Sequence, residues 1–229
     1  MAILRPGGLE LTDRGMELAD FSKGSRILDV GCGEGDSVAH LNEDLGMDAE
    51  GIDMNLVRIS DAKEQHPGIN VNFGDGEFLD AYMSFTFDGV LMEGSLSQIN
   101  MPDEALHEAY CVMKKGGKLI ISDVYEIDPD PQQMKAVRIE ADRQARMPRK
   151  EGDCEDRGLK FTDFRFEGAF YEEPLRRVIE EVGFRITGFE DHSEDAEKFF
   201  EYFPHLNTES GGRKRRIGYF LLTAEKPEK

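Results

Sequence analysis

The hydrophobic and polar positions of the chain form short apolar runs separated by stretches of helical periodicity. Five runs have the length and composition of buried strands. They occupy residues 27–30, 49–52, 69–73, 87–92 and 118–123. Between two of them, Val38, Leu41 and Leu45 recur at helical spacing. Strands that alternate with helices predict an α/β fold with a mainly parallel sheet.

Capping residues, prolines and glycines set the expected ends of the helices. The predicted helices cover residues 12–20, 36–45, 55–66, 102–115 and 174–182. Thr12 is expected to cap the first, and the pair Gly116–Gly117 to follow the end of the fourth. Two further strands, residues 184–189 and 217–224, complete the predicted sheet.

A glycine-rich turn directly follows the first predicted strand. Asp29, Gly31, Gly33 and Gly35 stand at alternate positions. A strand, a glycine turn and a helix N-terminus together form a nucleotide-type pocket at the carboxyl edge of a parallel sheet. The third glycine comes one residue earlier than in the dinucleotide fingerprint, and Asp36 stands where that fingerprint has glycine. Carboxylates in such a turn favour a ligand with a cationic end over a pyrophosphate.

Acidic residues also end the next strands. Asp53 follows the second strand at the distance expected of a carboxylate that binds ribose hydroxyls. Asp75, Gly76 and Glu77 follow the third strand, and Glu93 ends the fourth. An Asp at such a position is also a common turn former. The ligand interpretation is preferred because these acids follow the glycine turn in order.

Two segments carry a family resemblance. The run Asp29-x-Gly31-x-Gly33-x-Gly35 resembles motif I of class I methyltransferases that use S-adenosylmethionine (SAM). The segment from Ala105 to Leu119 resembles the helix, glycine pair and strand of the small-molecule members. Pro6-Gly7-Gly8-Leu9, Glu93-Gly94-Ser95-Leu96-Ser97 and Ser122-Asp123-Val124-Tyr125 are similar to an uncharacterised bacterial subgroup. The resemblance covers about three-quarters of the chain.

The resemblance implies a Rossmann-like sheet of seven strands in the order 3-2-1-4-5-7-6. One strand is antiparallel, helices cover both faces, and an insert follows the fifth strand. Residues 1–229 are expected to form one methyltransferase domain. Residues 126–170 are the insert, with a helix at about 132–147, and are interpreted as a lid, a substrate subdomain or a dimer surface.

The resemblance also implies the reaction and its residues. SAM would donate a methyl group to a small molecule and leave S-adenosylhomocysteine (SAH). The residues expected to bind SAM are Asp29, Gly31, Cys32, Gly33, Gly35, Asp53, Met54, Asp75, Gly76, Glu77 and Glu93. Met54 is expected to pack on the adenine and Asp75 to bind its amine. Alignment of the two reactants is the main catalytic demand.

The sequence does not single out one general base. Many small-molecule members have a His after the fourth strand, where this chain has Gln98, which takes up no proton at pH 7. Glu93 and Asp123 are the candidate bases, with Tyr125 and Tyr82 as hydrogen-bonding partners, and Glu93 and Tyr125 are the preferred catalytic pair. Holding the methionine end of SAM, or capping the Gly94–Ser95 turn, is an equally good interpretation of Glu93.

Two alternative functions stay open. The absent His and the acidic composition also fit a SAM-binding module that acts with a partner protein and has no activity of its own. An NAD-dependent oxidoreductase on a related fold is disfavoured by the early third glycine. Arsenic methylation is disfavoured because Cys32 and Cys111 are not placed as metalloid ligands.

Composition limits the partners. The formal net charge is −19, which disfavours nucleic acid and anionic membranes. The basic run Arg213–Arg216 is interpreted as a solubilising hairpin tip. Three cysteines without a C-x-x-C pair favour reduced thiols and a cytoplasmic protein, and no metal site or signal peptide is expected. The sequence leaves a homodimer open.

Overall fold

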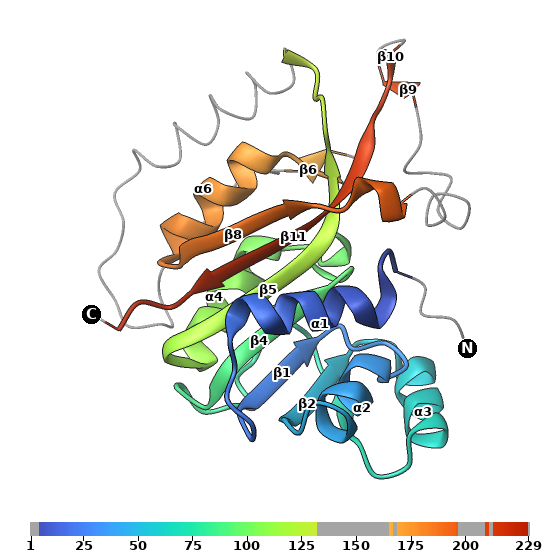
Figure 1. Ribbon diagram of the computed structural model, residues 1–229, viewed down its shortest axis with the longest axis vertical. Coiled ribbons are helices and arrows are strands. Elements are labelled where there is room, and N and C mark those ends of the chain that lie inside the picture. Colours follow the sequence, from blue (N-terminus) through green and yellow to red (C-terminus); the bar gives the residue numbers. More distant parts are fainter. Residues whose placement is uncertain (1–4, 132–164, 167–168, 197–208, 211–212, 229) are drawn as a thin grey trace.

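The computed structural model describes residues 5–131, 165–166, 169–196, 209–210 and 213–228, and in it a central sheet lies between two layers of helices (Figure 1). The sheet order is β3-β2-β1-β4-β5-β11-β8. The strands in this order are Asn70–Phe73, Asp48–Asp53, Arg26–Val30, Phe87–Glu93, Met113–Glu126, Ile217–Glu225 and Arg185–Asp191. β11 runs antiparallel to both β5 and β8. The predicted order 3-2-1-4-5-7-6 with one antiparallel strand is therefore confirmed.

Short strands extend the sheet beyond this path. β6 (Arg165–Phe166) pairs with β7 (Ala169–Phe170), and β7 pairs with β5. β9 (Glu209–Ser210) and β10 (Arg213–Lys214) form a separate two-stranded ladder. The helix predicted at 132–147 lies outside the described residues.

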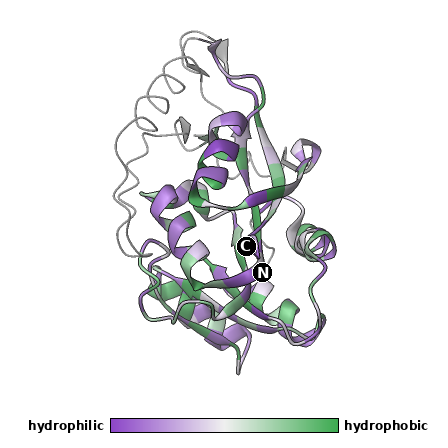
Figure 2. Cartoon of the chain, turned by 90° about the vertical axis from the view of Figure 1, so that its left-hand side faces the viewer, coloured by the Kyte–Doolittle hydropathy of each residue, from purple (hydrophilic) through white to green (hydrophobic). Residues whose placement is uncertain are grey.

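The period of two along the strands divides the core into two layers. In β4, Val90 and Met92 join the cluster beneath α4 (Pro102–Val112) and α6 (Glu172–Val182). Leu91, between them, joins the opposite cluster with α1 (Gly8–Ala19), α2 (Asp36–Glu43) and α3 (Leu56–Gln65). The helices bury one stripe each, so they carry both hydrophilic and hydrophobic residues (Figure 2). Two short 3-10 turns, η1 (Leu96–Gln98) and η2 (Ser193–Ala196), follow β4 and β8.

Some helix ends match the sequence signals and others do not. Asn55 caps α3 as expected, because its side-chain oxygen accepts hydrogen bonds from the amides of Val57 and Arg58. The expectation that Thr12 caps the first helix is wrong, because α1 begins at Gly8 and Thr12 is buried within it. The hydroxyl of Thr12 bonds instead with a residue on β4, described below.

The fourth helix is shorter than predicted. α4 ends at Val112, and residues 113–117 already belong to β5. Lys226 explains the early end, because its Nζ donates to the carbonyls of Tyr110 (2.6 Å) and Met113 (2.9 Å). The amide of Gly116 in turn donates to the carbonyl of Lys226 at 2.8 Å. The C-terminal segment therefore draws this stretch into the sheet.

The basic run is not simply a solubilising tip. Arg215 is 3% exposed, and its Nε donates to Glu126 on β5 at 3.0 Å. The neighbouring Arg216 is exposed.

None of the described helices has both the length and the apolarity needed to cross a membrane.

Candidate functional site at the carboxyl edge of the sheet

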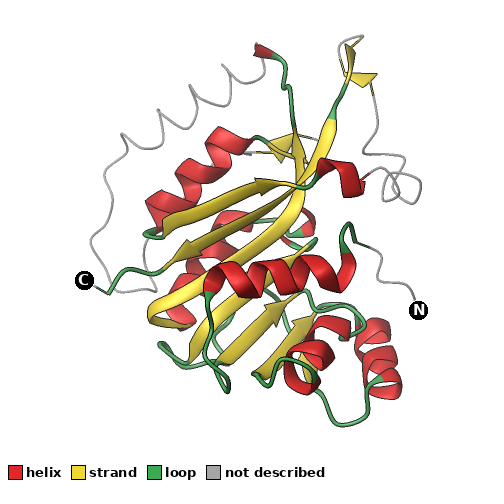
Figure 3. Cartoon of the chain, viewed as in Figure 1, coloured by secondary structure: helices red, strands yellow, loops and turns green. Residues whose placement is uncertain are grey.

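A cavity of about 660 Å³ opens at the carboxyl ends of β1, β2 and β4. The loops after these strands leave the sheet at one edge, beside α2 and α3 (Figure 3). Its wall includes nine of the eleven residues predicted to bind the cofactor: Gly31, Cys32, Gly33, Asp53, Met54, Asp75, Gly76, Glu77 and Glu93. Asp29 and Gly35 are not among the lining residues. The tertiary structure thus gathers most of the predicted residues around one space of the size typical of small-ligand sites.

The glycine turn needs glycine for two different reasons. Gly31 has φ +83°, and a Cβ there would lie 2.4 Å from the Cβ of Ser95. Gly35 has φ +81°, and a Cβ there would lie 2.6 Å from Ile69. Gly31 therefore lets the loop after β4 approach the cavity, whereas Gly35 lets α2 start against the loop that precedes β3.

Asp53 fixes the turn to the end of β2. One carboxylate oxygen accepts from the amide of Gly33 (2.9 Å) and the other from the amide of Asn55 (2.7 Å). Met54, next in the chain, is 59% exposed and lines the cavity. These contacts hold the Asp53 carboxylate at the cavity wall.

The acids after β3 are also held in place. The carboxylate of Asp75 accepts from the amide of Glu77 at 3.0 Å, the Asp-Gly turn considered from the sequence. Glu77 is buried and accepts from the amide of Met101 at 3.0 Å. Both side chains line the cavity. The turn and the ligand interpretations of Asp75 are therefore compatible.

Glu93 is surrounded by three donors from separate elements. Its carboxylate accepts from the hydroxyls of Thr12 on α1 (3.1 Å) and Ser37 on α2 (3.0 Å). The guanidinium of Arg5 lies 3.0 Å from it and also donates to Thr12 at 2.6 Å. Sequence analysis missed Arg5, Thr12 and Ser37 as site residues, because no local pattern marks them as neighbours of Glu93.

Asp29 lies beneath the site on β1. It pairs in register with Leu91, so it shares a sheet face with Glu93 two residues further along β4. It is 2% exposed, and its Oδ1 has no hydrogen-bond partner. Burial, followed by the negative charge of Glu93, raises the pKa of Asp29 to about 8, while Arg5 opposes the shift. Burial also raises the pKa of the Cys32 thiol well above its ordinary range.

The structure separates the two residues predicted to be catalytic. Tyr125 is buried in the core layer of α4 and α6, whereas Glu93 faces α1 and α2. The Tyr125 ring packs edge-on against Phe189 and Phe220, both at a centroid distance of 5.8 Å. It is not among the cavity-lining residues. Glu93 and Tyr125 thus lie on opposite faces of the sheet, and a shared catalytic role for them does not fit this arrangement.

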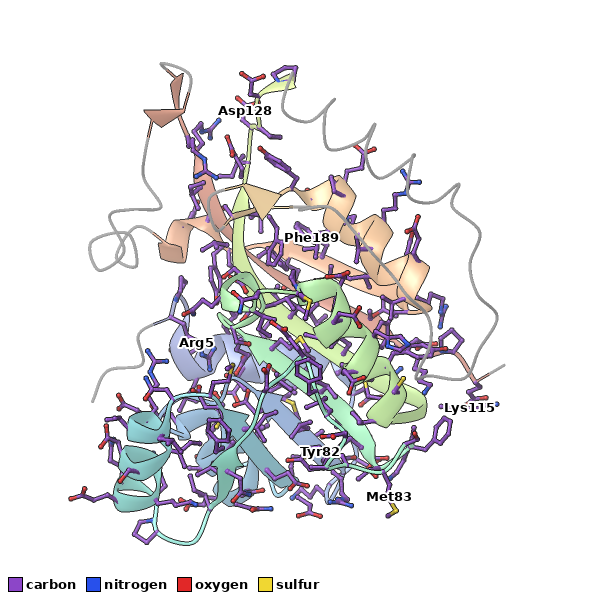
Figure 4. All side chains as sticks on the ribbon, turned by 180° about the vertical axis from the view of Figure 1, so that it is seen from behind. Arg5, Tyr82, Met83, Lys115, Asp128 and Phe189 are labelled. Carbon is purple, nitrogen blue, oxygen red and sulfur yellow. The ribbon has the colours of Figure 1, made fainter. Side chains whose placement is uncertain are left out.

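Asp123, Tyr82 and Gln98, the other residues considered near the proton-transfer step, also contact protein groups. Asp123 is 1% exposed and accepts from the amide of Ser97 at 2.8 Å. Tyr82 packs against Phe87 at the start of β4, and Figure 4 shows it at the other end of the strands from Arg5. Gln98 lines the cavity and donates to the carbonyl of Gly94 at 2.5 Å.

The cavity wall is strongly acidic. Of its described residues, six are acids and two are arginines: Glu34, Asp36, Asp53, Asp75, Glu77 and Glu93, with Arg5 and Arg58. Among the described residues, no three His, Cys, Asp or Glu side chains are arranged to hold a metal ion. The wall is therefore suited to a ligand with positive charge.

Comparison with known proteins gives a consistent result. Residues 21–160, more than half of the chain, match a family model described as a methyltransferase domain. The chain is 31% identical over 121 residues to phosphoethanolamine N-methyltransferase 3 of Arabidopsis thaliana, covering 51% of this chain and 24% of the plant protein. It is 34% identical over 100 residues to demethylmenaquinone methyltransferase of Renibacterium salmoninarum, covering 44% and 41%. The matches thus span less than half of either relative.

Solved structures share the fold across almost the whole chain. The [4+2]-cyclase SpnF superposes with a TM-score of 0.69 at 23% identity, covering 95% of this chain and 81% of the cyclase. Phosphoethanolamine N-methyltransferase 2 of Haemonchus contortus, in complex with SAM, gives 0.65 at 16% identity, covering 99% and 54%. At these identities the likeness shows the fold alone, and the reaction has to be argued from the site.

Proposed function

The chain belongs to the methyltransferase domain family, and on that premise we propose that it transfers a methyl group from SAM to a small-molecule acceptor, leaving SAH. The observation that carries this proposal is the acidic cavity built on the glycine turn. A cationic sulfur compound fits such a wall better than a pyrophosphate does, because the wall has six carboxylates and only two guanidinium groups among its described residues. The matched family model supports the same reaction class.

Features of the cavity itself test whether SAM fits. Gly31 and Gly33 line the cavity with backbone alone, and a Cβ at Gly33 would meet only Arg58, at 3.6 Å. The buried Oδ1 of Asp29 has no donor in the described structure, so a positive charge above it would be favourable. The volume of about 660 Å³ is ample for a nucleoside joined to an amino acid.

We assign the described residues to parts of the cofactor as follows. Asp53 would bind the ribose hydroxyls, Met54 would pack on the adenine, and Asp75 with Glu77 would border the adenine amine. Glu93 and Arg5, which carry opposite charges at one end of the cavity, would hold the amino-acid end. When bound, SAM supplies a methyl group carried by a positively charged sulfur.

The chain contributes to this reaction mainly by holding two reactants in line. Such alignment lowers a barrier by roughly 7–11 kcal/mol when the geometry is fixed. Glu93 suits this positioning role better than that of a base, because three donors already occupy its carboxylate. Tyr125 keeps a predicted catalytic role only if a substrate reaches the other face of the sheet.

The proposal includes the setting of the enzyme. Residues 1–229 would act as one domain in the cytoplasm. The predicted role of the insert at 126–170 as a lid, substrate subdomain or dimer surface concerns a segment that lies mostly outside the described residues. The net charge of −19 supports a small-molecule acceptor over nucleic acid or an anionic membrane.

Calorimetric titration with SAM and SAH tests the proposal. Binding of both below millimolar concentration is expected, and Asp53→Asn should weaken it at least tenfold. Asp48→Asn is a matched control, because Asp48 starts the same strand at the opposite edge and its side chain is 72% exposed. The absence of binding to either compound at millimolar concentration contradicts the proposal.

A second function, SAM binding without catalysis, is favoured by one observation. Each of the six cavity-lining carboxylates accepts a hydrogen bond from the protein, and Gln98 occupies the position of the base that many relatives use. Formation of SAH during incubation with a metabolite mixture, above the level without acceptor, would exclude this alternative. No SAH formation by a protein that binds SAM would favour it.

A further inference from the structure

We propose that Asp29 is a proton-linked charge sensor beneath the cofactor cavity: its carboxyl group is neutral in the ligand-free protein and releases its proton when a ligand of net positive charge binds. SAM is such a ligand, so this inference rests on the proposed function. In the binding step, the carboxyl O–H bond breaks, the proton passes to the solvent buffer, and no electrons are transferred.

No hydrogen-bond donor of the described residues reaches the Oδ1 atom of Asp29. Among the buried side-chain oxygen and nitrogen atoms of the described residues, the Oδ1 atom of Asp29 is the one that has no hydrogen-bond partner. Two amides of the turn that follows Asp29 are already used, because those of Gly31 and Cys32 both donate to the carbonyl of Ile52, at 2.8 and 2.9 Å. A buried carboxyl group without donors is more stable in the neutral form.

The charged groups that act on Asp29 come from three parts of the chain, and the titratable thiol of Cys32 lies nearby in the glycine turn. β4 contributes Glu93, β2 contributes Asp53, and the N-terminal segment contributes Arg5. α1 and α2 add only the uncharged hydroxyls of Thr12 and Ser37 at the same cluster. With all three acids ionised and Arg5 charged, this cluster would carry two net negative charges. Burial and the two acids together place the pKa of Asp29 at about 8, above neutral pH.

A ligand changes this balance through its net charge. SAM has a sulfonium, an ammonium and a carboxylate, and so carries one net positive charge, whereas SAH lacks the sulfonium and is neutral overall. An opposite charge within a few ångströms favours the ionised carboxyl group. Binding of SAM should therefore release more protons than binding of SAH.

Calorimetry in buffers with different enthalpies of ionisation measures this release. At pH 6.5, titration of the wild type with SAM should release roughly half to one proton per site, since Asp29 is almost fully protonated there. Sinefungin, a SAM analogue with a positively charged ammonium group in place of the methyl sulfonium, should release a similar number. SAH should release fewer. A pH of 6.5 also keeps the amino groups of the ligands protonated.

Two variants assign the proton. Asp29→Asn should abolish most of the release, and the surface variant Asp48→Asn should retain it. If Asp29→Asn does not fold, the wild type alone still decides. A release of roughly half to one proton makes the affinity for SAM rise about three- to tenfold between pH 6 and pH 7.

The outcomes separate this inference from the proposed function. SAM binding without proton release, an unchanged affinity between pH 6 and 7, or equal release by Asp29→Asn and the wild type would overturn the inference. A protein that binds no SAM in any buffer contradicts the proposed function itself.

Discussion

The guanidinium of Arg5 lies 3.0 Å from the carboxylate of Glu93, and both side chains are at most 10% exposed. This ion pair joins the segment before α1 to the end of β4 in the wall of the cavity. It closes one end of the site with groups that could hold the two charges of an amino acid. The segment before α1 therefore contributes Arg5 to the wall of the cavity.

Loss of Arg5 should destabilise the protein and weaken ligand binding. Arg5→Met leaves Glu93 buried with two hydroxyl donors, and we expect a decrease of about 3 kcal/mol in the free energy of unfolding. Urea denaturation measures it, and Arg26→Met, which removes a half-exposed ion pair with Glu50, should change it by less than about 1 kcal/mol. Equal effects of the two variants would contradict the role of the buried pair.

Gly31→Ala should disturb both stability and the cavity. The added methyl group would collide with Ser95, and the alanine would have to adopt a positive φ. We therefore expect the free energy of unfolding to fall by about 2–4 kcal/mol and the affinity for SAM to become much weaker. Gly68→Ala is the matched control, because Gly68 has φ +99° with nothing within 4 Å of its added Cβ. Thermal unfolding with and without SAM should show a larger loss for Gly31→Ala. A similar loss at both positions would mean that the contact with Ser95 is unimportant.

Asp29→Asn should make the ligand-free protein more stable at high pH. The folded pKa of about 8 is above the ordinary value of 3.8, so the stabilisation of the neutral form is present at low pH and is lost as the pH rises through 8. The advantage of the variant over the wild type should therefore grow between pH 4 and pH 8 and then level off. Urea midpoints at each pH measure the difference, and a constant difference would contradict the shifted pKa.

His40 should stabilise the contact between α1 and α2 at low pH. Its ring nitrogens lie 2.6 Å from Asp13 and 2.8 Å from Asp44, and two acceptors require a doubly protonated ring. Burial alone lowers the pKa of His40, but the hydrogen bonds to Asp13 and Asp44 outweigh it and raise the pKa above 6.5. The stabilisation is thus complete below pH 6.5 and is lost as the pH rises through the raised value. Compared with His40→Gln, the wild type should lose its advantage in unfolding experiments as the pH increases to 9.

Lys226 should be more important for stability than its position near the C-terminus suggests. It is 3% exposed, donates to two carbonyls at the end of α4, and lies over the rings of Phe85 (4.4 Å) and Tyr110 (4.3 Å). Lys226→Met should lower the free energy of unfolding by about 2–3 kcal/mol, because the carbonyls lose a charged donor. The exposed Lys115→Met on β5 should have little effect, and denaturant titrations of both variants test this.

The sequence pattern predicted where Glu93 and Tyr125 lie along their strands, but not which face of the sheet each side chain points to. Glu93 and Tyr125 both follow predicted strands, so sequence reasoning placed them at one edge of the sheet. Strand pairing puts Glu93 opposite Ser122, which has the other face parity from Tyr125. The two side chains therefore point to different layers, a fact that depends on register and not on either strand alone.

The local pattern of residues was enough to predict the main helices and strands of the sheet, the α/β class and the position of the acidic glycine turn, because periodicity and turn chemistry act within a few residues. The resemblance added the strand order. Only the tertiary structure decided that Arg5, Thr12 and Ser37 converge on Glu93, that Asp29 is buried without a donor, and that Arg215 pairs with Glu126. Each of these depends on segments far apart in the chain, whose packing and register no local pattern encodes.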